Sequence, residues 1–175
     1  MDDLVARVRQ ILSTTPERWL ALTAAIDPAR LAARPAPGQW SAAECLQHIL
    51  DTEMGAFSVR VEAFMAGRDL APFDPDAAGF RPEPGASPAG LANRFAEARA
   101  RSLTALERLI EADLDRTANH AEYGLVTMRE MLNEWAGHDL MHTVHAERAL
   151  MQPFVVGSGK WRGTFADHDV EARGG

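Results

Sequence analysis

Apolar residues recur at helical spacing in four long stretches of the chain, and this pattern predicts four amphipathic helices. In the first stretch the apolar phase continues across Pro16, which favours one kinked helix over residues 3–26 rather than a fresh start at the proline. The other three helices are expected over residues 42–65, 87–113 and 127–150. Because no stretch shows a convincing strand pattern, the sequence predicts an all-α four-helix bundle.

Capping signals mark where these helices begin. Ser41 and Glu44 have the spacing of a capping box, in which each side chain bonds the backbone N–H of the other residue. Thr127 and Glu130 repeat this spacing before the last helix. Serine followed by proline at residues 87–88 is a further helix start. We therefore interpret Glu44 as a capping residue rather than as a catalytic base.

Two long segments show no regular spacing of apolar residues. Residues 67–87, between the second and third helices, form a long loop with four prolines, in which Phe73 and Phe80 are candidate anchors. A loop of this length is either a surface linker or a lid over a site. Residues 151–175 are expected to form an irregular tail, packed on the bundle or trailing from it, so the bundle domain is assigned to residues 1–150.

Composition narrows the class of protein. The 175 residues are 46% hydrophobic, which suits one domain with a substantial core. A net charge of −7 without a basic stripe argues against nucleic acid and anionic membranes as partners. The chain has one cysteine, Cys45, and shows neither a signal-peptide pattern nor a long apolar run. A cytoplasmic soluble domain is therefore the expectation.

Histidines interrupt the apolar face of the last helix. His138 and His142 lie within the arc that should enter the core, four residues apart, so their imidazoles can meet at one ion. Asp139 and His145 lie at the margins of this arc, and His48 lies at the edge of the apolar face of the second helix. These positions are open to two interpretations, a metal site or a polar core network without a metal.

A motif pair favours the metal site. Trp40-Ser41-x-x-Glu44-x-x-x-His48, followed far downstream by His138-Asp139-x-x-His142, resembles the DinB-like superfamily, which includes the YfiT-like metal-dependent hydrolases. The resemblance covers roughly residues 16–150. It implies a four-helix bundle, often a homodimer, with a divalent metal held by His48, His138 and His142. Members include thiol-dependent S-transferases and isomerases. Where such members often carry glutamine, this chain has His145.

The resemblance implies a metalloenzyme that activates water or a low-molecular-weight thiol, for hydrolysis or for S-transfer on a small molecule. Zinc and nickel are the foremost candidate ions, with iron and manganese as alternatives. Asp139, His145 and His120 are weaker catalytic candidates, with Asp139 as a possible orienting partner of a ligand imidazole. The competing interpretation is a non-catalytic metal-binding or stress-associated bundle.

Overall fold

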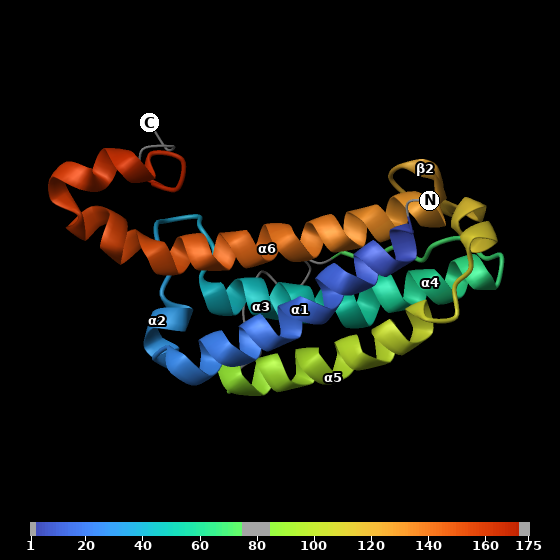
Figure 1. The fold of residues 1–175 in the computed structure, drawn as a ribbon, viewed down its shortest axis with the longest axis horizontal. Coiled ribbons are helices and arrows are strands. Elements are labelled where there is room, and N and C mark those ends of the chain that lie inside the picture. The colour runs from blue at the N-terminus through green and yellow to red at the C-terminus, as the bar shows by residue number, and fades with distance from the viewer. Residues whose placement is uncertain (1–2, 75–84, 172–175) are drawn as a thin grey trace.

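Four long helical rods lie side by side in the structure (Figure 1), a computed structural model that describes residues 3–74 and 85–171. The rods confirm the predicted all-α four-helix bundle. They are α1 (Leu4–Ala25), α3 (Ala42–Thr52) continuing through the π-helical η1 (Glu53–Phe57) into α4 (Ser58–Met65), α5 (Pro88–Leu106) and α6 (Met128–Gly157). A short α2 (Pro28–Ala32), not predicted, lies in the first connector.

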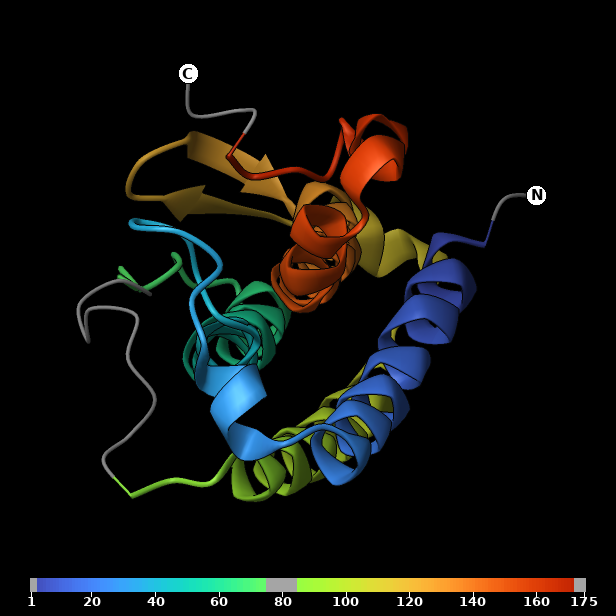
Figure 2. The same cartoon turned by 90° about the vertical axis from the view of Figure 1, so that its left-hand side faces the viewer.

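The helices close into a ring in which sequence neighbours are not always spatial neighbours. Helix α1 packs against α5 and α6, and α3 packs against the same two helices. Helices α1 and α3 therefore lie diagonally opposite each other (Figure 2). Helices α3–α4 and α5 run in the same direction (Figure 1), so the long segment between them has to link opposite ends of the bundle. Phe80, one of the two predicted anchors of this segment, lies outside the described residues.

The core consists of two clusters of buried side chains, one towards each end of the bundle. One cluster contains Leu12, Phe64 and Trp135, and the other contains Trp19, Leu46, Ile49, Phe95 and Ala146. Along α6 the first cluster ends near Ala136 and the second begins at Ala146. The two histidines of α6 lie between them.

The predicted helix starts are confirmed. Both capping boxes are present, with the Ser41 hydroxyl accepting from Glu44 N and the Thr127 hydroxyl accepting from Glu130 N. The Ser87 side chain caps α5, with Pro88 in its first turn. Helix α1 runs without interruption across Pro16, as its apolar phase predicts.

The second rod is not a uniform α-helix. Its middle turn, Glu53–Phe57, is π-helical, although the rod keeps the predicted limits of residues 42–65. The wider turn places Glu53, 1% exposed, in the interior, where its carboxylate accepts from Arg99 of α5 and from the indole of Trp135. Single π turns within helices occur frequently at functional sites.

The predicted end of the third helix near residue 113 is wrong, because α5 ends at Leu106. The chain then turns into the 3₁₀ helix η2 (Glu111–Asp115). Asp113 stabilises this turn, because its carboxylate accepts from the backbone N–H of Ile110 at 3.1 Å and from Arg116 at 2.8 Å. The apolar residues that continue the helical period, Leu109 and Leu114, are buried from this turn instead.

The expectation of no strands is also wrong. Strands β1 (Thr117–His120) and β2 (Gly124–Thr127) form an antiparallel hairpin, with Thr117 opposite Thr127 and His120 opposite Gly124. Gly124 has φ +72°, a conformation that glycine adopts readily. The backbone N–H of Leu70, after α4, donates to Asn119 O at 2.9 Å, which holds the hairpin against the bundle.

The last helix is longer than predicted. Helix α6 passes through residue 150 and Pro153 to Gly157, and the 3₁₀ helix η3 (Gly159–Phe165) follows. The Gln152 side chain donates to His168 O and accepts from Val170 N, so the tail folds back onto α6. Over the described residues, no helix is long and apolar enough to cross a bilayer.

Candidate metal centre

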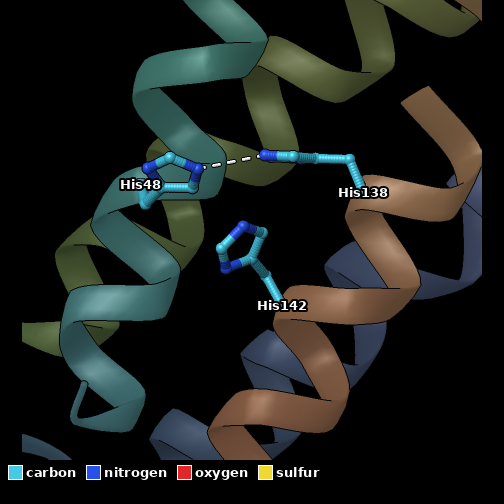
Figure 3. Close-up of side chains that lie close together, drawn as sticks. All are labelled: His48, His138 and His142. Carbon is cyan, nitrogen blue, oxygen red and sulfur yellow. Dashed lines mark hydrogen bonds between the residues drawn. The ribbon is translucent and has the colours of Figure 1, made fainter. Parts of the chain in front are cut away.

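Three histidines from two helices converge inside the bundle. His48 on α3 meets His138 and His142 on α6, and one ligand nitrogen from each lies within 4.8 Å of the others. Nε2 of His48 is 3.0 Å from Nε2 of His138 (Figure 3). Figure 3 also shows a ring nitrogen of His142 directed towards this pair. The structure thus brings together the three residues assigned from the motif pair, and no other such cluster occurs among the described residues.

Burial favours the neutral form of His138 and His142. Desolvation, followed by the proximity of His48, lowers the pKa of His138 to about 4. Desolvation, followed by the proximity of His138 and His48, lowers the pKa of His142 to about 2. Neutral imidazole is the form that binds a metal, because its free nitrogen carries the donor lone pair.

The donor set fits a divalent ion. Two imidazole nitrogens on a tetrahedral zinc, with bonds of about 2.0–2.1 Å, lie roughly 3.3 Å apart, close to the 3.0 Å between His48 and His138. Three ligands also leave positions for water or substrate.

Aromatic side chains cover the cluster. The Trp40 ring, one residue before the cap of α3, stacks on His142 with centroids 5.3 Å apart and meets His48 edge-on at 5.0 Å. Phe57 lies edge-on to His138 at 5.3 Å and stacks on Trp135. These contacts restrict rotation of the imidazoles, which gives Trp40 a structural reason to belong to the motif.

A cavity of about 500 Å³, here called the large cavity, adjoins the cluster on the side of His138. Its wall includes apolar side chains from η1, from the loop after α4, from β2 and from α6. The polar groups in the wall are Thr52, Arg60, His120, Glu122, Tyr123, Glu130, Glu134 and His138. A cavity of this size accommodates a small organic molecule next to a metal ligand.

His120 belongs to this wall. It lies on β1, where Nε2 is 3.1 Å from Arg60 and the ring stacks on Tyr123. Burial, followed by the charge of Arg60, lowers its pKa. His120 is therefore half-buried on a strand that lines the large cavity, which keeps it among the catalytic candidates.

Glu134 is a functional candidate that the sequence analysis missed. It lies one turn before His138 on α6 and lines the same cavity. Desolvation raises the pKa of its carboxyl, against the opposing charge of Arg60. The spacing of four residues from a ligand histidine was the available signal, since such residues share one helix face.

His145 lies outside the three-histidine cluster, so the structure does not make it a fourth ligand. Its ring centroid is 5.5 Å from that of His142, at a right angle. It lines a second cavity of about 230 Å³, here called the small cavity, together with Trp40, His142 and Arg148. The departure from the family pattern at residue 145 therefore changes the wall of this cavity.

Asp139 does not hydrogen-bond a ligand imidazole. Its carboxylate, 1% exposed, accepts two hydrogen bonds from Arg99, at 2.9 and 2.8 Å, and one from the Thr15 hydroxyl. The expected role of orienting an imidazole is thus replaced by a buried ion pair that fixes α6 against α5 and α1. The sequence offered no indication of Arg99, which lies far away on another helix.

Glu44 and Cys45 have structural roles. Glu44 accepts from Ser41 N at 2.8 Å and pairs with Arg34, which confirms that it caps α3. Cys45 is completely buried, and burial raises the pKa of its thiol to about 12. Neither residue offers a free group to a substrate.

Comparisons with known proteins identify the family and the fold. The DinB superfamily model matches residues 11–146. No curated protein sequence matches the chain. The solved structure of YfiT from Bacillus subtilis, described as a probable metal-dependent hydrolase with an unusual four-helix bundle topology, superposes with a TM-score of 0.75. The match has 18% identity and covers 86% of this chain and 87% of that one, which supports the shared fold. Because the family model spans most of the chain, this protein belongs to the DinB superfamily.

Proposed function

We propose that this chain binds a divalent metal ion through His48, His138 and His142 and acts as a metalloenzyme on a small molecule in the large cavity. The observation that carries the proposal is the convergence of three histidine side chains, one of which, His138, lines that cavity. Zinc and nickel are the foremost candidates, with iron and manganese as alternatives, since imidazole binds all four. The description of YfiT as a probable metal-dependent hydrolase supports this proposal.

A divalent ion at this position supplies a hydroxide near neutral pH by acidifying bound water, or a thiolate by deprotonating a low-molecular-weight thiol. The protein residues then have separate tasks. Apolar side chains such as Phe57 and Leu70 exclude water from the substrate. Arg60 offers a fixed positive charge in the cavity wall, and Glu134, with its raised pKa, holds or accepts a proton close to His138.

Metal binding is tested with protein purified without a histidine tag. Metal analysis should find about one ion per chain, and calorimetry against a competing chelator should give a tight zinc site. His48→Ala should weaken zinc binding by several orders of magnitude, because one imidazole bond is lost. The matched control is His145→Ala, which should bind zinc almost as wild type does. The reverse order of effects would remove His48 from the site.

The reaction class is tested with two substrate panels, esters and amides for hydrolysis, and a low-molecular-weight thiol with small electrophiles for S-transfer. Turnover that requires metal and falls in Glu134→Gln, at unchanged zinc affinity, is the expected result. Zinc binding without turnover in either panel would instead favour the non-catalytic metal-binding bundle.

A further inference from the structure

The small cavity approaches the three-histidine cluster from the opposite direction along α6 to the large cavity. Its volume is about 230 Å³, and its wall comes from residues 35–40, from α6 after the cluster and from Val170 of the tail. His142 lines this cavity, whereas His138 lines the large one. One metal site is therefore flanked by two separate cavities.

Arg148 places a positive charge in the wall of the small cavity. It is half-buried, its Nε is inaccessible to solvent, and its guanidinium has no hydrogen-bond or ion-pair partner in the described part of the chain. Every other half-buried arginine there has a partner. The pairs are Arg9 with Glu107, Arg18 with Glu147, Arg60 with His120, Arg129 with Glu111 and Arg162 with Asp169. A partly desolvated guanidinium without an acceptor is unfavourable, so this position suits a bound anion.

The charge of the two cavities differs. Three glutamates, Glu122, Glu130 and Glu134, line the large cavity beside a single arginine. No carboxylate lines the small cavity, as far as the described residues show. Acidic residues outnumber basic ones in this chain, which has a net charge of −7, so a cavity wall with an arginine and no carboxylate differs from the average surface.

The shape and donors of the small cavity select the kind of anion. A guanidinium presents two parallel N–H groups, which match a carboxylate bidentately. His145 lines the same wall and offers a ring N–H as a second donor. A doubly charged phosphate or sulfate would require further cationic groups, and the wall offers one arginine. The Trp40 ring provides a flat apolar wall for a short carbon chain.

We propose that the small cavity binds the carboxylate of a small organic acid between Arg148 and His145, next to the metal-site residue His142. This site deepens the proposed function, on which its place in a reaction rests, because it puts an acidic molecule beside the metal centre. Binding of the carboxylate itself involves only protein groups, so it can be measured on metal-free protein.

The test uses propionate as the probe and propionamide as its uncharged analogue, titrated into metal-free ¹⁵N-labelled protein by NMR. Propionate should shift the NMR signals of the Trp40 indole N–H and the Val170 amide in a saturable way. Propionamide should bind at least about tenfold more weakly than propionate. Arg148→Gln should weaken propionate binding by roughly tenfold. Equal affinity for the acid and the amide, or an unchanged affinity in Arg148→Gln, would overturn the proposal.

Arg60→Gln is the matched control, because Arg60 lines the other cavity. Its propionate affinity should equal that of wild type, and a loss in this variant instead of Arg148→Gln would place the anion in the large cavity and refute the proposal. Zinc titration of the same proteins separates the two proposals. Arg148→Gln with wild-type zinc affinity and weakened propionate binding supports the carboxylate site. Wild-type protein that binds propionate but no zinc would refute only the metal function.

Discussion

The three histidines illustrate how burial sets the chemistry of a single residue. His138 and His142 are largely removed from water and face other imidazoles, so their protonation is opposed by desolvation and by the neighbouring rings. The motif spacing could indicate which residues meet, but it could not indicate how far their pKa values fall. The size of the pKa shift depends on burial by aromatic rings such as Trp40 and Phe57, which lie outside the motif's histidine positions.

A first prediction concerns the pH dependence of the metal-free protein. The folded-state pKa of His138 is about 4, below the value of about 6.5 in an unfolded chain. The unfolded state therefore binds more protons between these values, so stability should fall as the pH drops from about 6.5 towards about 4. Calorimetric Tm values from about pH 7 to about pH 4.5 should fall less steeply in His138→Gln than in wild type. Parallel curves would contradict the assigned pKa.

A second prediction concerns Gly55, in the π-helical turn. A Cβ added there would lie 2.3 Å from Cε2 of Phe73, far inside contact distance. Gly55→Ala should therefore displace the Phe73 ring from the wall of the large cavity while leaving the cluster in place. The affinity for a substrate found in the two panels should fall, while the affinity for zinc should stay that of wild type. The control is Gly137→Ala, whose Cβ would meet nothing within 4 Å, and it should change neither substrate affinity nor zinc affinity.

Residues that line cavities were the hardest to predict. Glu134 lies four residues before His138, but this spacing alone does not separate it from an ordinary surface charge, and Arg148 shows no such spacing to either histidine. Their importance depends on the hairpin and on residues 35–40, which lie far away in the sequence and close the cavities around them.

At the scale of elements, a buried ion network connects the helices. Arg99 of α5 donates to Asp139 of α6, to Glu53 in η1 and to the backbone oxygen of Leu12 in α1. All three charged side chains are 1% exposed. The network explains why the π turn faces inwards, because Glu53 reaches the same guanidinium as Asp139.

A third prediction follows from this network. Arg99→Met should destabilise the protein by about 3–5 kcal/mol, because it leaves two carboxylates buried without their cation. Urea unfolding monitored by circular dichroism gives the free energy. The control is Arg9→Ala, which breaks the exposed pair with Glu107 and should change stability by less than about 1 kcal/mol. Equal effects of the two substitutions would show that the buried network contributes no more than a surface pair.

Elements were predictable where a long period or a cap defined them. The starts of α3, α5 and α6 followed from Ser41, Ser87 and Thr127, and the length of α1 from its unbroken apolar phase. The hairpin was missed because each strand has four residues and its stability comes from packing on the bundle. The end of α6 was missed because Pro153, which usually ends a helix, is tolerated there in the last turns.

At the scale of the whole molecule, α6 carries an apolar stripe on its outer surface. Leu140, Met141 and Val144 are 38%, 45% and 44% exposed, close together on one face beside Gly137. Contiguous exposed apolar side chains of this kind mark association surfaces. We expect two copies of the chain to pack through this stripe as a homodimer.

This fourth prediction is tested by light scattering at micromolar concentration, which should give twice the 19.1 kDa chain mass. Met141→Glu should shift the protein to the mass of one chain, because it places a charge in the stripe. Leu125→Glu, on the exposed hairpin at 69% exposure, should leave the mass unchanged. Wild-type protein with the mass of a single chain would disprove the dimer.

The ring arrangement of the helices has a consequence for how the chain folds as it is synthesised. Helix α6 lies between α1 and α3 and supplies two of the three histidines, so both the fourth side of the bundle and the metal site depend on the helix that is made last. Until α6 docks, the faces of α1 and α3 that pack against it remain uncovered, and His138 and His142 are not beside His48. Binding of the proposed metal therefore requires the completed bundle, and the interval before α6 docks is when a nascent chain is most exposed to aggregation.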